Sequence, residues 1–380
     1  MYLKGGCFKQ VVPRDSLESL SVGLTYVGSI AAGAFSTGVE IVHFFTYFGS
    51  LGLISVALAA VLFTIFPLIG LRYAQLTGFY DYWRFALSLI GPRLVWAFEA
   101  SYIALVTLFL SAVMAAGGAL TSTIFKMPYY LSLAIMAALS AIIVALGRRA
   151  VLGSETVLTL VKVSIITAAT ASIIAYSWRS LIKSLHTIHT SSGWVGSPLG
   201  FLISPILYVS YNLVGIPAMS SVAQDLKGRR GVVYASLIGG LTLSVMILLE
   251  YLATLPYYQY VTNPKYPSAN LPIYYGLIYS GAPKILAYLY AAFLYIALLT
   301  ATVGNVNAVA YRFEASFRLN VSRLAVSIVM VSTALVIALA GIYRIVSVGY
   351  TALSYVFLAL FTVPLAFIGG YRVLKLERGR

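Results

Sequence analysis

Charged residues are scarce in this sequence of 380 residues, making up 9% of it, whereas 61% of the residues are hydrophobic. Soluble domains carry roughly a quarter charged residues, so this composition excludes a soluble globular fold. Cysteine is almost absent, with Cys7 as the single example. One cysteine excludes an intrachain disulfide and a cysteine-based metal cluster.

Long apolar runs fill most of the chain, and each is close to the ~20 residues that a helix needs to cross the hydrocarbon core. They lie at residues 20–48, 51–76, 92–118, 128–147, 153–177, 199–222, 231–255, 284–310, 321–341 and 344–370. The pattern predicts an all-α membrane protein with ten transmembrane helices. It divides the chain into a first half (20–177), an extracytoplasmic connection (178–198) and a second half (199–370), flanked by cytoplasmic segments 1–19 and 371–380.

The 25 basic residues outnumber the 10 acidic ones and give a net charge of +15. Such a charge suits a nucleic-acid partner, but the basic residues gather in alternate connections between spans. Eighteen lie on one side and six on the other, with Lys162 inside a span. The positive-inside rule then places both termini in the cytoplasm. We expect an integral protein of the plasma membrane with no nucleic-acid partner.

Two spans contain helix-breaking residues near their middle. The first carries Gly33-Ala34-Phe35-Ser36-Thr37-Gly38, and the sixth carries Tyr211-Asn212-Leu213-Val214-Gly215-Ile216-Pro217. Glycines also allow helices to pack closely, and a lone proline kinks a helix. Interrupted helices at matching places in two halves, however, are typical of inverted-repeat transporters that bind their solute at the bilayer midplane.

Each break is followed by residues that favour a new helix. Thr37 and Glu40 have the spacing of a capping box, in which each side chain accepts a hydrogen bond from a free backbone N–H. This spacing predicts that a helix restarts at Thr37. Pro217 suits the first turn of a helix, where its missing N–H costs nothing.

The stretch from Gly33 to Ile41, followed by Phe44, Phe45 and Gly49, resembles the opening helix of YkvI-like membrane proteins. Those proteins belong to the amino acid-polyamine-organocation superfamily, which shares the LeuT-type fold. Val161-Lys162-Val163 and Tyr211-Asn212-Leu213 are similar to further family positions, whereas Val39 stands where the family typically has Gln. The resemblance implies a five-plus-five inverted repeat with broken helices 1 and 6, and a transport mechanism without a defined substrate.

Glu40 is the main candidate for substrate binding. A carboxylate inside a span costs about 3 kcal/mol on insertion scales, so it is expected to face a cavity or a partner. There it would contact a substrate amine or a coupling cation; the alternative is a capping role alone. The full predicted substrate site comprises Gly33, Ala34, Phe35, Ser36, Thr37, Gly38, Glu40, Tyr211, Asn212 and Gly215.

Lys162, Thr300 and Thr302 are the candidate ion-coupling residues. The resemblance implies that span five lines a cation site, which a lysine ammonium occupies in some proton-coupled relatives. Lys162 would then replace a structural sodium, with Thr300 and Thr302 as cation ligands from span eight. The alternatives are a lysine that snorkels to the membrane surface and threonines that bond between helices.

Four other polar residues in the spans receive structural interpretations. Glu99, Glu155 and Glu250 are interpreted as carboxylates near span ends that pair at helix ends. His43 is interpreted as a packing residue, although its titration range suits proton handling.

These features predict a secondary active transporter that moves a small solute by alternating access. The solute would be an amino acid, an amine or a similar zwitterion, and transport would be proton-linked or sodium-independent. A channel, a sensor or a sodium-coupled symporter would use the same fold. An enzyme is not expected, because the sequence has no HExxH or GxSxG motif. No resident metal or cofactor is predicted beyond a coupling H⁺ or Na⁺, and the oligomeric state stays open.

Overall fold

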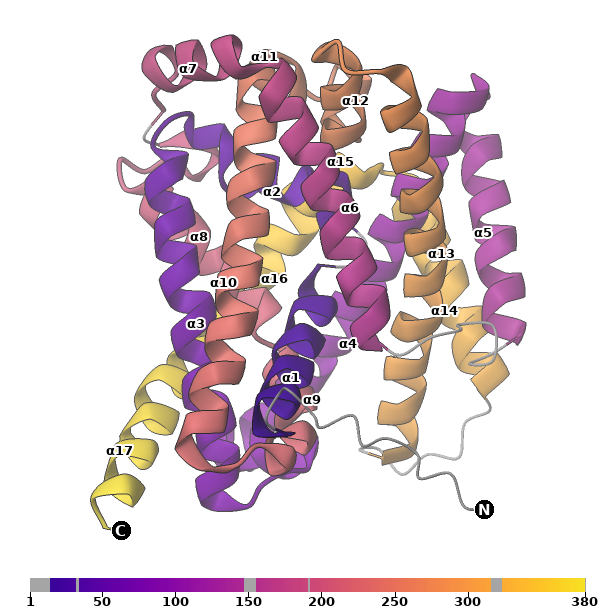
Figure 1. Cartoon of the computed structure of the whole chain (residues 1–380). Helices are drawn as coiled ribbons and strands as arrows, with labels where there is room; N and C mark the ends of the chain where they lie inside the picture. The colour runs from indigo at the N-terminus through magenta and orange to yellow at the C-terminus, as the bar shows by residue number, and fades with distance from the viewer. Residues whose placement is uncertain (1–13, 32–33, 147–154, 191, 316–322, 380) are drawn as a thin grey trace, which may run out of the picture.

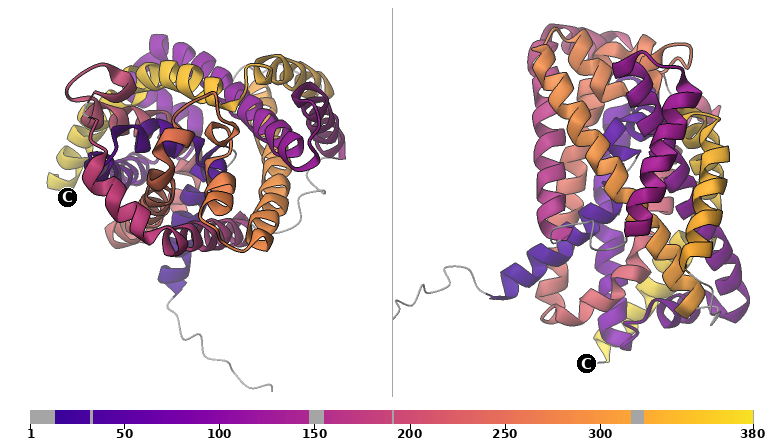
Figure 2. Two further views of the ribbon diagram at one scale, coloured as in Figure 1. Left: turned by 90° about the horizontal axis from the view of Figure 1, so that it is seen from above. Right: turned by 90° about the vertical axis from the view of Figure 1, so that its right-hand side faces the viewer.

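The computed structural model describes residues 14–31, 34–146, 155–190, 192–315 and 323–379, and these are almost all helical (Figure 1). Gly33 of the predicted substrate site lies outside the described residues. The rest of the predicted site is described. Figure 2 shows the long helices running side by side along one common direction.

The first half of the chain begins with an interrupted helix and continues with four more helices. Its elements are α1 (Arg14–Ile30), η1 (Phe35–Thr37), α2 (Val39–Phe44), η2 (Thr46–Phe48), α3 (Gly52–Thr77), α4 (Tyr82–Phe125), α5 (Tyr129–Leu146) and α6 (Glu155–Tyr176). A short surface segment follows, with α7 (Trp178–Thr187) and η4 (Gly193–Val195).

The second half also begins with an interrupted helix. Its main elements are α8 (Gly200–Asn212), α9 (Gly215–Met219), η5 (Ser220–Asp225), α10 (Gly228–Thr254), α13 (Lys284–Ala315) and α14 (Arg323–Ala338). The connection after α10 contains η6 (Leu255–Tyr257), α11 (Tyr258–Val261), η7 (Pro267–Ala269) and α12 (Pro272–Tyr279). The last helical segment of the chain consists of α15 (Ile342–Arg344), α16 (Thr351–Phe357) and α17 (Gly370–Arg378). It also contains π-helical segments at Ile345–Tyr350, Leu358–Thr362 and Leu365–Gly369.

Seven of the described helices are long and apolar enough to cross a membrane. Three shorter apolar stretches, Val39–Phe48, Tyr129–Val144 and Ala325–Ala338, occupy the other predicted spans. The arrangement is therefore compatible with ten spans. The third span differs from prediction because α4 begins at Tyr82 and continues through a kink at Gly91, whose φ is 80°. Pro92 has no N–H to donate, so the helix bends there without ending.

Helix α1 packs between α10 and α6, and α10 also packs against α3. Glycines on α10 allow this close approach. A side chain at Gly239 would overlap Tyr26 of α1, and one at Gly240 would overlap Thr64 of α3. Small residues at such contacts let transmembrane helices gain packing energy along their length.

The two ends of the bundle carry different elements (Figure 1). The beginning of α1 lies at the same end as α17, which we call the α17 end, and α7, α11 and α12 cover the opposite α7 end. At the α17 end Arg72 of α3 forms an ion pair of 2.9 Å with Glu377. Arg372 donates hydrogen bonds to the Tyr73 hydroxyl and the Ser88 carbonyl, so α17 is fixed to α3 and α4.

Candidate functional site

The first span is interrupted between α1 and α2, as predicted. The carbonyl of Ala34 accepts hydrogen bonds from the Thr37 N–H (3.1 Å) and the Thr37 hydroxyl (2.6 Å), which closes the short turn η1. Gly38 then takes a φ of 86°, a conformation that costs little only for glycine. A Cβ at Gly38 would also lie 2.8 Å from Ile273, so the break depends on this glycine.

The capping box predicted at Thr37 and Glu40 is wrong. Gly38 is the N-cap of α2 and provides no side-chain cap, so the new helix begins at Val39. The Thr37 hydroxyl accepts a bond of 3.3 Å from the Val39 N–H. Because the left-handed Gly38 separates Thr37 from the helix, the Glu40 carboxylate cannot reach back and is free for a tertiary contact.

The second break lies between α8 and α9, at Leu213 and Val214. The Leu213 N–H donates to Val209 and the Ile216 N–H donates to Leu213, both at 2.9 Å. Pro217 lies in the first turn of α9, as predicted. This break is milder than the first, because both linking residues keep right-handed helical angles.

Glu40 lies where the two interrupted helices meet. The Tyr211 hydroxyl of α8 donates a hydrogen bond of 2.7 Å to Glu40 Oε2. The two side chains are buried, with 3% and 0% of their surface exposed. Glu40 and Tyr211 are 171 positions apart in the sequence, and the structure brings them together as the sequence analysis placed them, in one site.

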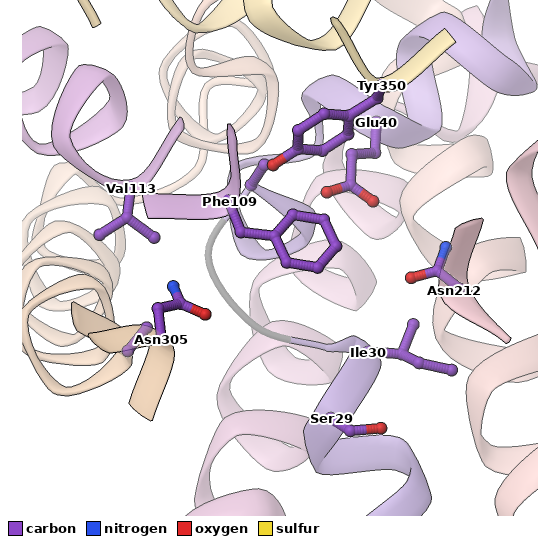
Figure 3. A pocket seen from close by; sticks show the side chains of 10 residues that line it. Ser29, Ile30, Glu40, Phe109, Val113, Asn212, Asn305 and Tyr350 are labelled. Carbon is purple, nitrogen blue, oxygen red and sulfur yellow. The ribbon is translucent and has the colours of Figure 1, made fainter. Parts of the chain in front are cut away.

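A cavity of about 50 Å³ opens beside Glu40 (Figure 3). It is lined by Ser29, Ile30, Ala34, Glu40, Phe109, Val113, Asn212, Ala301, Asn305 and Tyr350. Glu40 is the only one of these residues with an acidic or basic side chain, and the two asparagines and Ser29 add neutral polar groups. A site of this composition suits a small solute with a positively charged group.

Of the predicted substrate-binding residues, Ala34, Glu40 and Asn212 line the cavity. Tyr211 supports it through Glu40, and Asn212 donates from Nδ2 to the Tyr208 carbonyl at 2.9 Å, which leaves its Oδ1 as an acceptor. Gly215 packs beside Ser29. The remaining predicted residues, Phe35, Ser36, Thr37 and Gly38, are buried in the break itself.

Two aromatic residues of the cavity were not predicted. Phe109 comes from α4 and Tyr350 from the π-helical segment Ile345–Tyr350, and their ring centroids lie 5.3 Å apart. Tyr350 also lies 5.3 Å from Tyr211. No local pattern marks either residue, although π-helical segments often occur at functional sites.

The predicted ion-coupling residues lie outside the cavity lining. Lys162 is half-buried on α6, which packs against α1 and α13. The hydroxyls of Thr300 and Thr302 donate to carbonyls of their own helix, those of Ala297 (3.0 Å) and Leu299 (2.6 Å). Their role in ion coupling stays a prediction.

Two of the three carboxylates assigned to helix ends are fully buried. Glu99 is fully buried well inside α4, which begins seventeen residues earlier at Tyr82. Glu250 is fully buried in α10, and within the described residues neither of its carboxylate oxygens has a hydrogen-bond partner. Glu250 lies near the end of α10 at Thr254, as predicted, but the pairing expected there is not found among the described residues. The Glu155 side chain lies outside the described part.

His43 packs in the core, as interpreted from the sequence. Its ring stacks on Trp194 at a centroid distance of 4.5 Å, and its Nε2 lies 3.0 Å from the Thr351 hydroxyl. The Trp194 indole N–H donates to the His43 carbonyl at 2.8 Å. Trp194 therefore closes the bundle over α2 at the α7 end.

Comparison with known proteins bears directly on this arrangement. No protein-family model matches the chain. The membrane protein YkvI of Bacillus subtilis is 23% identical over 366 residues, which cover 94% of this chain and 96% of that protein. The predicted resemblance to YkvI-like proteins is thus confirmed.

Solved structures match the fold over most of the chain. MhsT in complex with L-phenylalanine has a TM-score of 0.61 and 14% identity, covering 98% of this chain and 99% of its own. A manganese transporter from Eremococcus coleocola has a TM-score of 0.60 and 16% identity, covering 93% and 80%. Mhp1, a nucleobase-cation-symport-1 family transporter, has a TM-score of 0.54 and 12% identity in its closed conformation, covering 84% and 70%.

The chain has the LeuT fold. The predicted all-α LeuT-type fold with interrupted helices 1 and 6 is therefore confirmed, and the predicted count of ten spans is compatible with it. In the LeuT fold of this chain, the cavity beside Glu40 lies at the junction of those two helices, which is where sequence analysis placed the substrate site.

Proposed function

We propose that this protein is a secondary active transporter that moves a small solute by alternating access. The observation that carries the proposal is the position of Glu40, a buried carboxylate that lines the cavity where the two interrupted helices meet. Transporters with discontinuous helices bind their solutes at such junctions. The LeuT fold, shared with a manganese transporter and with Mhp1, supports the same function.

The solute is a small amino acid, an amine or a similar zwitterion. Glu40 would hold its ammonium group, because a carboxylate in a low-dielectric site strongly favours a cation. The amides of Asn212 and Asn305 and the polar groups of the first break would bind a carboxylate. MhsT, which was solved with L-phenylalanine, offers a precedent for an amino acid on this fold.

An organic solute fits the site better than a metal ion. Across the described residues, no group of three or more His, Cys, Asp or Glu side chains is arranged to hold a metal. The small cavity also favours a compact solute, because a volume of about 50 Å³ holds only a few water molecules or a similar number of non-hydrogen ligand atoms.

The coupling ion and the orientation form the second part of the proposal. Both termini face the cytoplasm of a cell whose plasma membrane holds the protein, in keeping with the bias of Lys and Arg toward one side. Lys162 takes the place of a structural sodium near Thr300 and Thr302, so transport is proton-linked or sodium-independent. A sodium-coupled symporter, a channel and a sensor are the competing functions.

Uptake by proteoliposomes containing the full chain tests the proposal. Labelled amines and amino acids are supplied with and without sodium, and Glu40→Gln is compared with the wild type. Asp225→Asn is the matched control, because Asp225 is an exposed carboxylate in η5. We expect Glu40→Gln to lose uptake and Asp225→Asn to retain it. Full transport by Glu40→Gln would contradict a charge-dependent role of Glu40.

A further inference from the structure

Glu250 is a buried carboxylate, as are Glu40 and Glu99, and the cavity lining does not include it. Its side chain on α10 is fully buried, and neither oxygen has a hydrogen-bond partner in the described parts of the chain. Glu40, in contrast, accepts a hydrogen bond from Tyr211. An ionised carboxylate without a donor is expensive in a low-dielectric interior, so Glu250 requires a cationic or protonic partner in this conformation.

The surroundings of Glu250 come from both interrupted helices. It interacts electrostatically with Glu40 on α2, with Tyr208 on α8 and with Tyr290 on α13. The Tyr290 hydroxyl donates to the Ser36 carbonyl in the first break. The Ser36 hydroxyl is itself buried and has no hydrogen-bond partner among the residues that the structure describes. Glu250 therefore belongs to a cluster of polar side chains around the two interrupted helices.

The other titratable groups on the elements that pack around α10 have partners other than Glu250, or lie closer to one end of the bundle. Tyr251 donates to the Gly49 carbonyl, and His43 on α2 faces Thr351 and Trp194. Tyr26 of α1 is a neutral phenol that interacts with Tyr208.

The remaining groups lie on α3, α6 and α12. On α3, Arg72 and Tyr73 bond at the α17 end. On α6, Thr159 packs beside Gly28 of α1, which lies between the first break and the α17 end. Lys162 lies one helical turn after Thr159. On α12, Tyr274 packs against Tyr275. Glu40 is thus the charged group that acts most directly on Glu250.

We propose that Glu250 is a proton-binding site, separate from the substrate cavity, and that a proton on Glu250 competes with a cationic group bound at Glu40. With the cavity free of a cation, two negative charges in one low-dielectric region repel each other, so Glu250 holds a proton. A cation at Glu40 cancels that repulsion and favours ionisation of Glu250. The O–H bond of Glu250 then breaks, and the proton leaves to water.

The direction of coupling follows from this competition. A cationic solute and a proton would occupy the protein in alternation, which is the requirement for exchange of one against the other across the membrane. This inference rests on the proposed transport function for the role of Glu40. The proton site at Glu250 itself rests only on burial and on the missing hydrogen bonds.

Infrared spectroscopy of the purified full chain tests the proton site without any ligand. The wild type is expected to show the C=O band of a protonated buried carboxyl, and Glu250→Gln is expected to lose it. Glu250→Asp keeps a carboxyl group and is expected to keep a shifted band. Thermal unfolding of both variants verifies that they are folded. A spectrum of folded Glu250→Gln identical to that of the wild type would overturn the proposal.

Methylammonium is the probe for the competition, because it is the smallest organic ammonium that suits the cavity. In weakly buffered solution with a pH indicator, methylammonium should release protons from the wild type in proportion to the ligand bound, and release should be lost in Glu250→Gln. Binding without proton release by the wild type would overturn the competition.

Two other results separate the remaining cases. If the carboxyl band depends on Glu250 but methylammonium does not stabilise the wild type against unfolding, the proton site stands and the cationic substrate of the proposed function fails. If sodium stabilises the wild type but not Glu250→Gln, the site takes a metal cation and the proton proposal is overturned.

Discussion

The Tyr211 hydroxyl donates a hydrogen bond of 2.7 Å to Glu40 Oε2 and thereby joins the two interrupted helices. The donor lies in the last turn of α8, which ends at Asn212, and the acceptor lies in the first turn of α2. Any motion that separates these helices must break this bond. It is therefore both a structural tie and a part of the candidate substrate site.

Replacement of Tyr211 by Phe removes the donor and leaves Glu40 buried without it. Hydrogen bonds to charged groups contribute about 1.5–3 kcal/mol, so we expect the free energy of unfolding to fall by about that amount. Unfolding of the purified protein measures the change. Tyr355→Phe is the control, because that side chain is 48% exposed, and an equal loss in both variants would contradict the role of the Tyr211 bond.

Alanine at Gly38 should distort the first break. The left-handed conformation costs a non-glycine residue about 1–2 kcal/mol, and the new Cβ would lie 2.8 Å from Ile273. Gly78 has a similar φ of 71° but open space around it. We expect Gly38→Ala to lower stability and uptake more than Gly78→Ala does, as measured by thermal unfolding and proteoliposome flux. Equal effects would mean that the contact with Ile273 is unimportant.

Loss of Trp194 should open the bundle at the α7 end. Its stacking on His43 and its hydrogen bond to the His43 carbonyl together stabilise the closed bundle by about 1.4 kcal/mol. Their loss should raise the equilibrium constant for opening about tenfold. In a Cys7→Ser background with Ala34→Cys, Trp194→Ala should raise the rate of labelling by a water-soluble thiol reagent about tenfold.

Trp178→Ala is the matched control for this labelling experiment, because Trp178 is exposed on α7. It should leave the labelling rate unchanged. A rise of similar size in both variants would show that the effect is not specific to the contact between Trp194 and His43.

Lys162 is expected to take part in ion coupling. Flux measured over a range of pH should become less dependent on pH in Lys162→Ala, because the titrating ammonium is lost. Unchanged pH dependence would make Lys162 a residue that only anchors the span at the membrane surface. Strict sodium dependence of the wild type would mean that sodium occupies the site assigned to the lysine.

Most spans and the two interruptions were predictable from local features of the sequence, and the resemblance to YkvI-like proteins implied the LeuT fold. A transmembrane helix satisfies its own backbone hydrogen bonds and needs a fixed length of apolar residues, so hydropathy alone locates most spans. Glycines, a proline and a buried carboxylate near the middle of spans one and six indicate the breaks, because such residues are unfavourable inside a continuous transmembrane helix. Glu40 was identifiable because a charge in a span demands a partner.

The partners of these residues were decided only by the tertiary structure. Tyr211 reaches Glu40 across 171 positions, and Phe109 and Tyr350 enter the cavity from two further helices. Gly38, in a left-handed conformation, is the N-cap of α2, so Glu40 does not form the predicted capping box. Glu250 is buried in the bundle. Sequence patterns report how a segment partitions into lipid and closes its own hydrogen bonds. Which side chains then meet depends on the rotation and depth of each helix, which are set by the packing of all the helices together.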